Sequence, residues 1–215
     1  MKIFIYDLID LIERYKPTMD RYIAFDCETG GLVRDRSLLT VYFVVLDSDL
    51  TTILGELDLS IKPNAGDCYR VTAEAMDVNK INLVEHDKIA ITEGEAAQKL
   101  YAFLQQMNPN GSSKLIPVGH NVTSDEDFIK EHLISPANWG RFVSYRRLDT
   151  GTISELLRAT GHMPRDVKGS LGSIAAFLGI KFPDAHTAKG DTLATVKVLR
   201  KVIRILREEH NGTPR

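Results

Sequence analysis

Two carboxylates with one residue between them, Asp26 and Glu28, follow an apolar run and precede a pair of glycines. If the run is a β-strand, alternate side chains share a face, so both acids point the same way, ~6 to 7 Å apart, and Cys27 points to the other face. Like charges at this separation repel unless a cation lies between them, and hard divalent ions such as Mg²⁺ prefer oxygen ligands. The spacing therefore predicts a metal site, with a solvated strand end as the simpler alternative.

A second acidic group occupies residues 125–127, after an apolar run at 115–119 and the pair His120-Asn121. Helix chemistry alone explains this group. Ser124 is a good N-cap, negative charge in a first turn interacts favourably with the helix dipole, and Asp127 is placed to complete a pair that resembles a capping box.

A third group consists of His186 and Asp191, at the start of a helical pattern that runs over residues 188–209. With His186 in the preceding loop and Asp191 one turn inside the helix, both side chains can reach one site. Taken alone, the two residues are equally explained as polar residues at the N-terminus of a helix.

Composition narrows the class of protein. A chain of 215 residues with 43% apolar and 26% charged residues predicts one domain with a buried core. The net charge of −2 gives no global positive field, so any contact with a polyanion must be local. The two cysteines fit neither a disulfide scaffold nor a zinc site, which favours a reducing, cytoplasmic setting, and no apolar stretch is long enough to span a membrane.

The elements that position the three groups follow from hydrophobic periodicity. Strands are expected at residues 22–25, 40–46, 53–61, 115–119 and 142–148, with the first three antiparallel because a short polar turn at 47–49 joins the second to the third. Residues 62–92 are expected to form an irregular functional loop with one helical piece at 73–78. Further helices are expected at 93–107, 152–159, 171–178 and 188–209, and an amphipathic one within residues 1–20. An antiparallel start followed by alternating strands and helices predicts a mixed sheet covered by helices.

The three groups together resemble one family. The strings FDCETGG at 25–31, HNVTSDEDF at 120–128 and HTAKGD at 186–191 are similar, in order and separation, to the motifs of the DEDDh family of 3′-to-5′ exonucleases, the DnaQ-like proofreading and RNase T type. The resemblance covers residues 22–206 and is supported by VTAEAMDVNKI at 71–81 and LGSIAAFLGI at 171–180. It implies an α/β fold of the RNase H-like type, with a mixed five-stranded sheet whose first three strands are antiparallel. It also implies an exonuclease domain at 21–209, between an N-terminal helical extension at 1–20 and a polar tail at 210–215.

The resemblance also implies ligands and roles. Asp26, Glu28, Asp125 and Asp191 would hold two divalent ions, Mg²⁺ or alternatively Mn²⁺, with Asp26 bridging both ions, Glu28 and Asp191 on the nucleophile side and Asp125 on the leaving-group side. His186 would be the general base, since an imidazole accepts protons near neutral pH. The chain departs from the family at Ser124, where an aromatic residue is usual, but spacing from His120 still favours Asp125 over Asp127.

Substrate contacts are implied for four residues, Thr29, Gly30, Leu32 and Asn121. Thr29 and Gly30 would lie near the terminal 3′-hydroxyl and Leu32 beside the last base; the alternative is a plain turn with a core leucine. Asp149 is interpreted as a helix cap or as an acid that supports the ligands. Tyr145 and Arg147, which alternate on the expected strand, are placed at its edge or against a nucleic-acid backbone. A basic stripe on the last helix is either a solvated face or a nucleic-acid track; it consists of Lys197, Arg200, Lys201, Arg204 and Arg207.

The function expected is metal-dependent release of nucleoside 5′-monophosphates from the 3′ ends, most simply single-stranded, of DNA or RNA, in DNA replication or repair. The alternative is a binding module or proofreading subunit that acts mainly by docking to a polymerase or another partner, and a homodimer is a further option. Because all four acids and the histidine are present, the catalytic interpretation is favoured. Cys27, expected to face away from the acids, should tolerate replacement by a small apolar residue.

Overall fold

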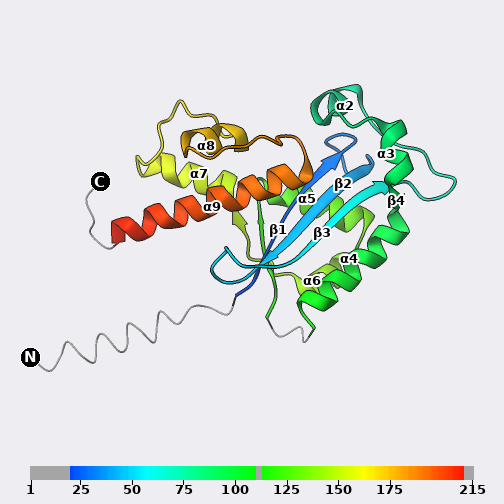
Figure 1. Ribbon diagram of the computed structural model, residues 1–215, viewed down its shortest axis with the longest axis horizontal. Coiled ribbons are helices and arrows are strands. Elements are labelled where there is room, and N and C mark those ends of the chain that lie inside the picture. The colour runs from blue at the N-terminus through cyan, green and yellow to red at the C-terminus, as the bar shows by residue number, and fades with distance from the viewer. Residues whose placement is uncertain (1–19, 110–112, 211–215) are drawn as a thin grey trace, which may run out of the picture.

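A six-stranded sheet forms the centre of the computed structural model, which describes residues 20–109 and 113–210 (Figure 1). The expected N-terminal helix and nearly all of the polar tail lie outside these residues. The strand order is β4-β3-β2-β1-β5-β6. The strands are β1 (Tyr22–Thr29), β2 (Leu38–Leu46), β3 (Ile53–Lys62), β4 (Ile91–Thr92), β5 (Ile116–Gly119) and β6 (Leu148–Asp149).

The pairing confirms the predicted mixed sheet. β1, β2 and β3 pair antiparallel, whereas β5 is parallel to β1 and β6 is parallel to β5. The sixth strand, β4, was not expected; its two residues pair in parallel with Ile61 and Lys62 of β3. Strands this short carry too little alternation to be recognised in a sequence.

Helices cover both faces of the sheet (Figure 1). They are α2 (Ala73–Asn79), α3 (Leu83–Ile89), α4 (Glu93–Met107), α5 (Val122–His132), α6 (Pro136–Phe142), α7 (Thr150–Ala159), α8 (Leu171–Phe177) and α9 (Ala188–His210). One face of the sheet packs on α4, α5 and α6, and the opposite face packs on α9, beside which α7 and α8 form a further apolar cluster. β2 is buried on both faces, which explains its nearly continuous apolar sequence.

The expected irregular segment at 62–92 is more ordered than predicted. It contains the expected helical piece as α2, and in addition α3 and β4. Each short helix begins at a capping side chain: Thr72 accepts from the Ala75 N–H, and Asn82 accepts from the N–H groups of Val84 and Glu85. A helix of two turns shows little periodicity, so its cap was the main signal.

The strand expected at 142–148 is wrong over most of its length. α6 extends to Phe142, only Val143 bridges to Leu115, and β6 begins at Leu148. Ser135 caps α6 and Pro136 occupies its first turn, so helix signals upstream prevail over the β-favouring residues that follow. The expected alternation of Tyr145 and Arg147 on a strand is wrong for the same reason.

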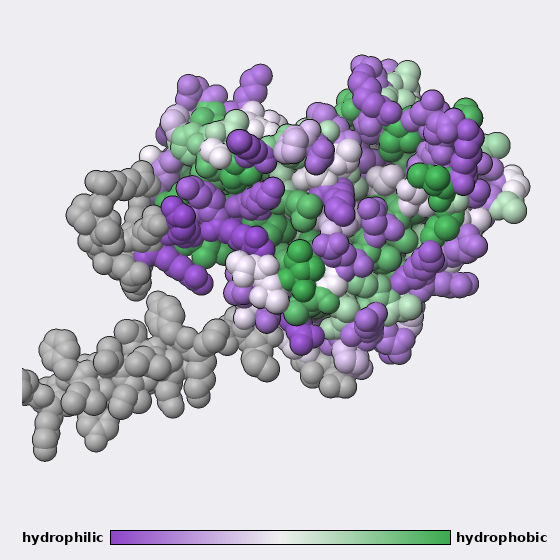
Figure 2. Space-filling view, in the orientation of Figure 1, coloured by the Kyte–Doolittle hydropathy of each residue, from purple (hydrophilic) through white to green (hydrophobic). Residues whose placement is uncertain are grey.

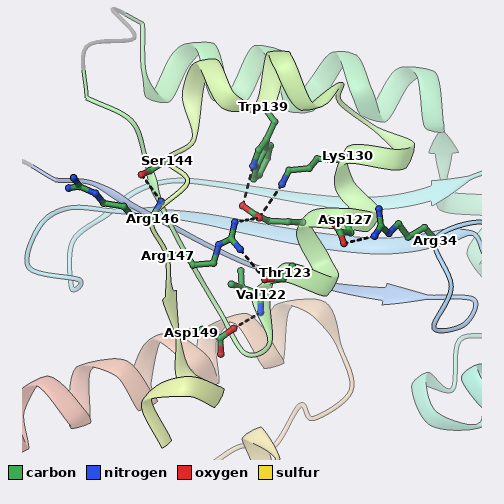
Figure 3. Close-up of polar contacts among 11 residues, drawn as sticks. Arg34, Val122, Thr123, Asp127, Lys130, Trp139, Ser144, Arg146, Arg147 and Asp149 are labelled. Atoms are coloured by element: carbon green, nitrogen blue, oxygen red, sulfur yellow. Dashed lines mark hydrogen bonds and ion pairs between the residues drawn. The ribbon is translucent and has the colours of Figure 1, made fainter. Parts of the chain in front are cut away.

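The start of α5 also differs from the prediction. α5 begins at Val122, so Ser124 is inside the helix and is not its N-cap, and Asp127 forms no capping box. The cap comes from a distant residue, because the Asp149 carboxylate accepts the N–H groups of Asn121 (3.2 Å) and Val122 (2.9 Å), the latter drawn in Figure 3. Asp149 is also the N-cap of α7, as one of its two interpretations predicted.

Among the helices that the structure describes, none combines the length and apolar character needed to cross a membrane.

Candidate active site

Three of the predicted metal ligands meet at the end of β1. Asp26 and Glu28 lie on β1, and Asp191 lies in the first turn of α9, which packs across β1 and β2. One carboxylate oxygen from each acid lies within 4.8 Å of the other two. Oxygens at this separation can contact one small cation between them; the alternation along β1 predicted the shared face of Asp26 and Glu28, and the family resemblance implied the addition of Asp191.

The fourth acid, Asp125, approaches β1 from α5. Its Oδ1 accepts the Cys27 backbone N–H at 3.0 Å, so the carboxylate is fixed at the edge of the acid cluster. The Cys27 thiol also hydrogen-bonds to Asp125. Burial is the main cause that raises the pKa of this thiol, and the negative charge of Asp125 is the second. The expectation that Cys27 faces away from all four acids is therefore wrong with respect to Asp125.

Burial and mutual repulsion raise the pKa values of the acids. Burial, followed by the charges of Asp125, Asp191 and Glu28, holds the pKa of Asp26 well above its usual range. Burial and the same kind of repulsion raise the pKa of Glu28 to about 7. Burial also raises the pKa values of Asp125 and Asp191. The four carboxyl groups thus form one electrostatic unit that a divalent cation would stabilise in its ionised form.

His186 lies in the loop before α9 and is exposed. Its backbone N–H donates to Asp191 Oδ1 at 3.1 Å, and its φ of 63° places it in the left-handed region. The loop packs tightly on Gly190, where an added Cβ would lie 2.0 Å from the carbonyl oxygen of Asp184. A glycine is therefore required at this point, and it holds the histidine loop against the acid at the start of α9.

The three consecutive acids of α5 have three different environments, because successive helical residues are rotated by about 100°. Asp125 faces β1, as described above. Glu126 is buried; it accepts from Trp139 Nε1 (3.2 Å) and pairs with Lys130 (3.1 Å) and Arg147 (2.9 Å). Asp127 pairs with Arg34 at 3.1 Å (Figure 3). The structure therefore places Asp125, and not Asp127, beside the acid cluster.

A pocket of about 510 Å³ adjoins the acids. Its lining comes from the end of β1, the following loop and α2, namely Cys27, Glu28, Thr29, Gly31, Leu32, Val33, Arg36, Thr72, Glu74, Ala75, Val78 and Asn79. Leu32 is 98% exposed, so the alternative of a core leucine is wrong. The residues of α2 and Arg36 were not named as site residues from the sequence; the motif at 71–81 was the available signal for α2.

Two predicted substrate residues have their polar groups partly engaged. The Thr29 carbonyl accepts from Asn79 Nδ2 at 3.2 Å, and the Thr29 hydroxyl donates to the Gly31 carbonyl at 2.8 Å. The Gly30 N–H donates to Ser37 O and the Gly30 carbonyl accepts from the Thr72 N–H. Thr29 lines the pocket, whereas Gly30 does not line it and instead joins the loop to Ser37 and to the start of α2.

Asn121 lies outside this pocket. It occupies the N-cap position of α5 with a φ of 59°, and its side chain makes no capping bond. Its Oδ1 lies instead against Gly151 of α7.

The basic stripe on α9 is not uniform. Figure 2 shows hydrophilic side chains gathered over this helix. Lys197, Arg204 and Arg207 are exposed, whereas Arg200 is half-buried and its Nε donates to the Leu50 carbonyl in the turn between β2 and β3. At least one member of the stripe thus has a structural role.

The comparison with family models found no match. Among curated proteins, an oligoribonuclease of Xanthomonas campestris pv. campestris is 27% identical over 191 residues, which cover 84% of this chain and 86% of that protein. An oligoribonuclease of Bordetella pertussis is 30% identical over 148 residues, covering 65% of this chain and 76% of that protein.

Solved structures of exonuclease I share the fold. One aligns with a TM-score of 0.69 at 17% identity, covering 86% of this chain and 41% of that chain. E. coli exonuclease I in complex with a dT13 oligonucleotide also has a TM-score of 0.69, at 16% identity, covering 87% of this chain and 43% of that chain. This chain therefore spans about two fifths of the exonuclease I chains, and the likeness shows a common RNase H-like architecture.

Proposed function

The chain belongs to the oligoribonuclease family of DEDD-type 3′-to-5′ exonucleases, and from this premise we propose that its acid cluster hydrolyses the terminal phosphodiester of short single strands. The product would be a nucleoside 5′-monophosphate. The observation that carries the proposal is the meeting of Asp26, Glu28 and Asp191, whose carboxylate oxygens lie within 4.8 Å of one another beside an open pocket.

The donor set suits a hard divalent cation. All candidate ligands are carboxylates, which Mg²⁺ and Mn²⁺ accept, and no cysteine or histidine is among the three that converge. Burial raises the pKa values of these groups, so a bound cation would favour their ionised forms. Asp26 would contact two ions, Glu28 and Asp191 one of them, and Asp125 the other, directly or through water.

Two such ions, when bound, would supply an activated water and would stabilise the departing oxygen of an in-line displacement. The protein residues would orient these parts. Asp125 is fixed by the Cys27 N–H, and Asp191 by the His186 N–H, so neither carboxylate needs to reorganise during the reaction.

His186 would accept the proton of the attacking water. Because the loop is exposed, the imidazole can turn toward the acids. The hydrogen bond from the His186 backbone to Asp191 keeps the residue beside them. An imidazole is the side chain that most often serves as a general base in enzymes.

Short oligoribonucleotides are the substrates that the relatives' name suggests, and single-stranded DNA is the second choice. A site that holds only the last few nucleotides needs little positive charge, in agreement with a net charge of −2. The alternative of a docking module for a polymerase or a second copy of the chain is less favoured, because docking alone would not require four clustered acids. We expect the protein to act in the cytoplasm.

The test uses 5′-labelled single-stranded RNA and DNA of several lengths with Mg²⁺, and with Mn²⁺ in a parallel series. We expect a ladder of products shortened from the 3′ end, and resistance when the 3′-hydroxyl is blocked by phosphate. Asp125→Asn should abolish the ladder, whereas Asp127→Asn, the matched change on the same helix, should retain it. Internal cleavage, or equal activity of the two variants, would contradict the assignment.

A further inference from the structure

The loop that follows β1, residues 30–37, is closed upon itself. The Gly30 N–H donates to Ser37 O at 2.8 Å, and the Arg36 N–H donates to Val33 O at 2.9 Å. A third bond, from the Thr72 N–H to Gly30 O at 2.7 Å, joins the loop to the start of α2. The loop is therefore a fixed wall of the pocket beside the acids.

The outer side of the same loop is anchored to α5. Arg34 pairs with Asp127 at 3.1 Å, and His132 Nε2 donates to the Arg34 carbonyl at 3.0 Å. Figure 3 shows Arg34 and Asp127 directed toward one another. Arg34 thus anchors the loop to α5, and it does not line the pocket.

Arg36, two residues later, lines the pocket and has a different environment. Among the described residues that line this pocket it is the only cation. Its aliphatic stem lies across Gly31, where an added Cβ would meet Arg36 Cγ at 2.9 Å. Its Nε is buried without a hydrogen-bond acceptor among the described residues, since the nearest acid, Asp35, lies at 3.8 Å and is 66% exposed. The guanidinium thus has no close acceptor among the described residues, and its terminal N–H groups, rather than the buried Nε, would donate to a group that enters the pocket.

The position of the pocket limits what that acceptor can be. When the scissile phosphate lies at the acids, a chain that ends in a 3′-hydroxyl has no further phosphate beyond it. Only the sugar and base of the last nucleotide remain to enter the pocket, whose wall includes the apolar Leu32, Val33 and Val78. The acceptors that remain are the sugar hydroxyls, which do not distinguish one base from another, and the oxygen and ring nitrogen atoms on the edge of the base, which do.

We propose that Arg36 is a specificity-determining residue whose guanidinium donates to the edge of the 3′-terminal base and favours guanine. Guanine offers O6 and N7 side by side to the two-pronged guanidinium, whereas adenine replaces the carbonyl by an amino donor. The inference rests on the proposed exonuclease function and concerns its choice of terminal nucleotide.

The experiment compares single-stranded oligonucleotides that differ only in the last base, guanine against adenine, with kcat and KM measured separately. For the wild type we expect a ratio of kcat/KM on the order of tenfold in favour of guanine, arising mainly in KM. Arg36→Met should reduce the ratio to near one, and Arg36→Lys should retain part of it. Arg34→Met, the matched change in the same loop but outside the pocket, should keep the wild-type ratio. Because each ratio is taken within one variant, a general loss of activity cancels.

Binding of guanosine and adenosine 5′-monophosphates, measured by calorimetry with Mg²⁺, gives a second readout that needs no turnover. The same preference and the same loss in Arg36→Met are expected. The role of Arg36 would be overturned if the guanine-to-adenine ratio were the same in the wild type and in Arg36→Met, or if the wild type acted equally well on both bases. Either result would leave the exonuclease proposal intact. A wild-type enzyme that shortens no oligonucleotide would instead overturn the proposed function.

Discussion

The acid cluster predicts an unusual dependence of stability on pH and Mg²⁺. Burial raises the pKa of Glu28 from its ordinary 4.5 to about 7. Between these two values the folded state binds more protons than the unfolded state, so the free energy of unfolding falls as the pH rises and stays low above about 7. At about 1.4 kcal/mol per pH unit, Glu28 alone costs the metal-free fold about 3 kcal/mol at pH 8. Asp26, Asp125 and Asp191 act in the same direction.

A divalent cation should offset this cost, because it stabilises the ionised acids. The assay is thermal unfolding of the full chain in EDTA and in saturating Mg²⁺ from pH 5 to 8.5. For a chain of this size, about 3 kcal/mol corresponds to about 6 to 12 °C in Tm. We expect Mg²⁺ to raise Tm by about this amount at pH 8 and by much less at pH 5.

Glu28→Gln separates this explanation from a general effect of salt. In EDTA at pH 8 the variant should be more stable than the wild type, since a neutral amide avoids the buried charge, and Mg²⁺ should stabilise it less. Replacing Mg²⁺ by Na⁺ at equal ionic strength controls for screening. The reasoning is refuted if the metal-free wild type keeps a constant Tm between pH 5 and 8, or if Glu28→Gln is the less stable protein in EDTA.

Three further changes test the supports of the site. Asp149→Ala removes the acceptor for four backbone N–H groups at the starts of α5 and α7, so it should lower the free energy of unfolding by about 1 to 3 kcal/mol in urea titrations; a change near zero would contradict the shared cap. His186→Ala should lower kcat by about 10²- to 10⁴-fold and remove the rise of rate through neutral pH, and an unchanged pH profile would assign the proton to another group. Gly190→Ala places a Cβ against the Asp184 carbonyl and should lower kcat by on the order of 10- to 100-fold. Alanine favours a helix more than glycine does, so the helix itself should tolerate the change and only the loop should move. A wild-type kcat in that variant would contradict a role for the loop position in catalysis.

The parts of the fold that were predictable from the sequence are those with long, regular patterns. The first three strands and α9 each run long enough for their apolar alternation or periodicity to be unambiguous, and α9 carries Asp191 to the end of β1 as the family resemblance implied. α3, β4 and β6 are too short for such patterns. The start of α5 was mistaken because its cap, Asp149, comes from a residue 28 positions after Asn121.

The candidate site divides in the same way. Asp26 and Glu28 share a face because of local strand geometry, which a sequence contains. The position of Arg36 depends on a loop that the Gly30–Ser37 bond closes and that a bond from Thr72, distant in the chain, joins to α2; the second bond leaves no local signal.

Asp26 is the residue that we propose to bind the divalent ions that drive hydrolysis. Its most direct test is Mg²⁺-dependent shortening of a 5′-labelled oligonucleotide by the wild type and by Asp26→Ala, measured with thermal unfolding on the same samples. We predict that Asp26→Ala stays folded, produces no shortened products at any Mg²⁺ concentration, and loses the stabilisation by Mg²⁺ at pH 8. If the folded Asp26→Ala protein shortened the oligonucleotide at the wild-type rate, Asp26 could not be a ligand that hydrolysis requires.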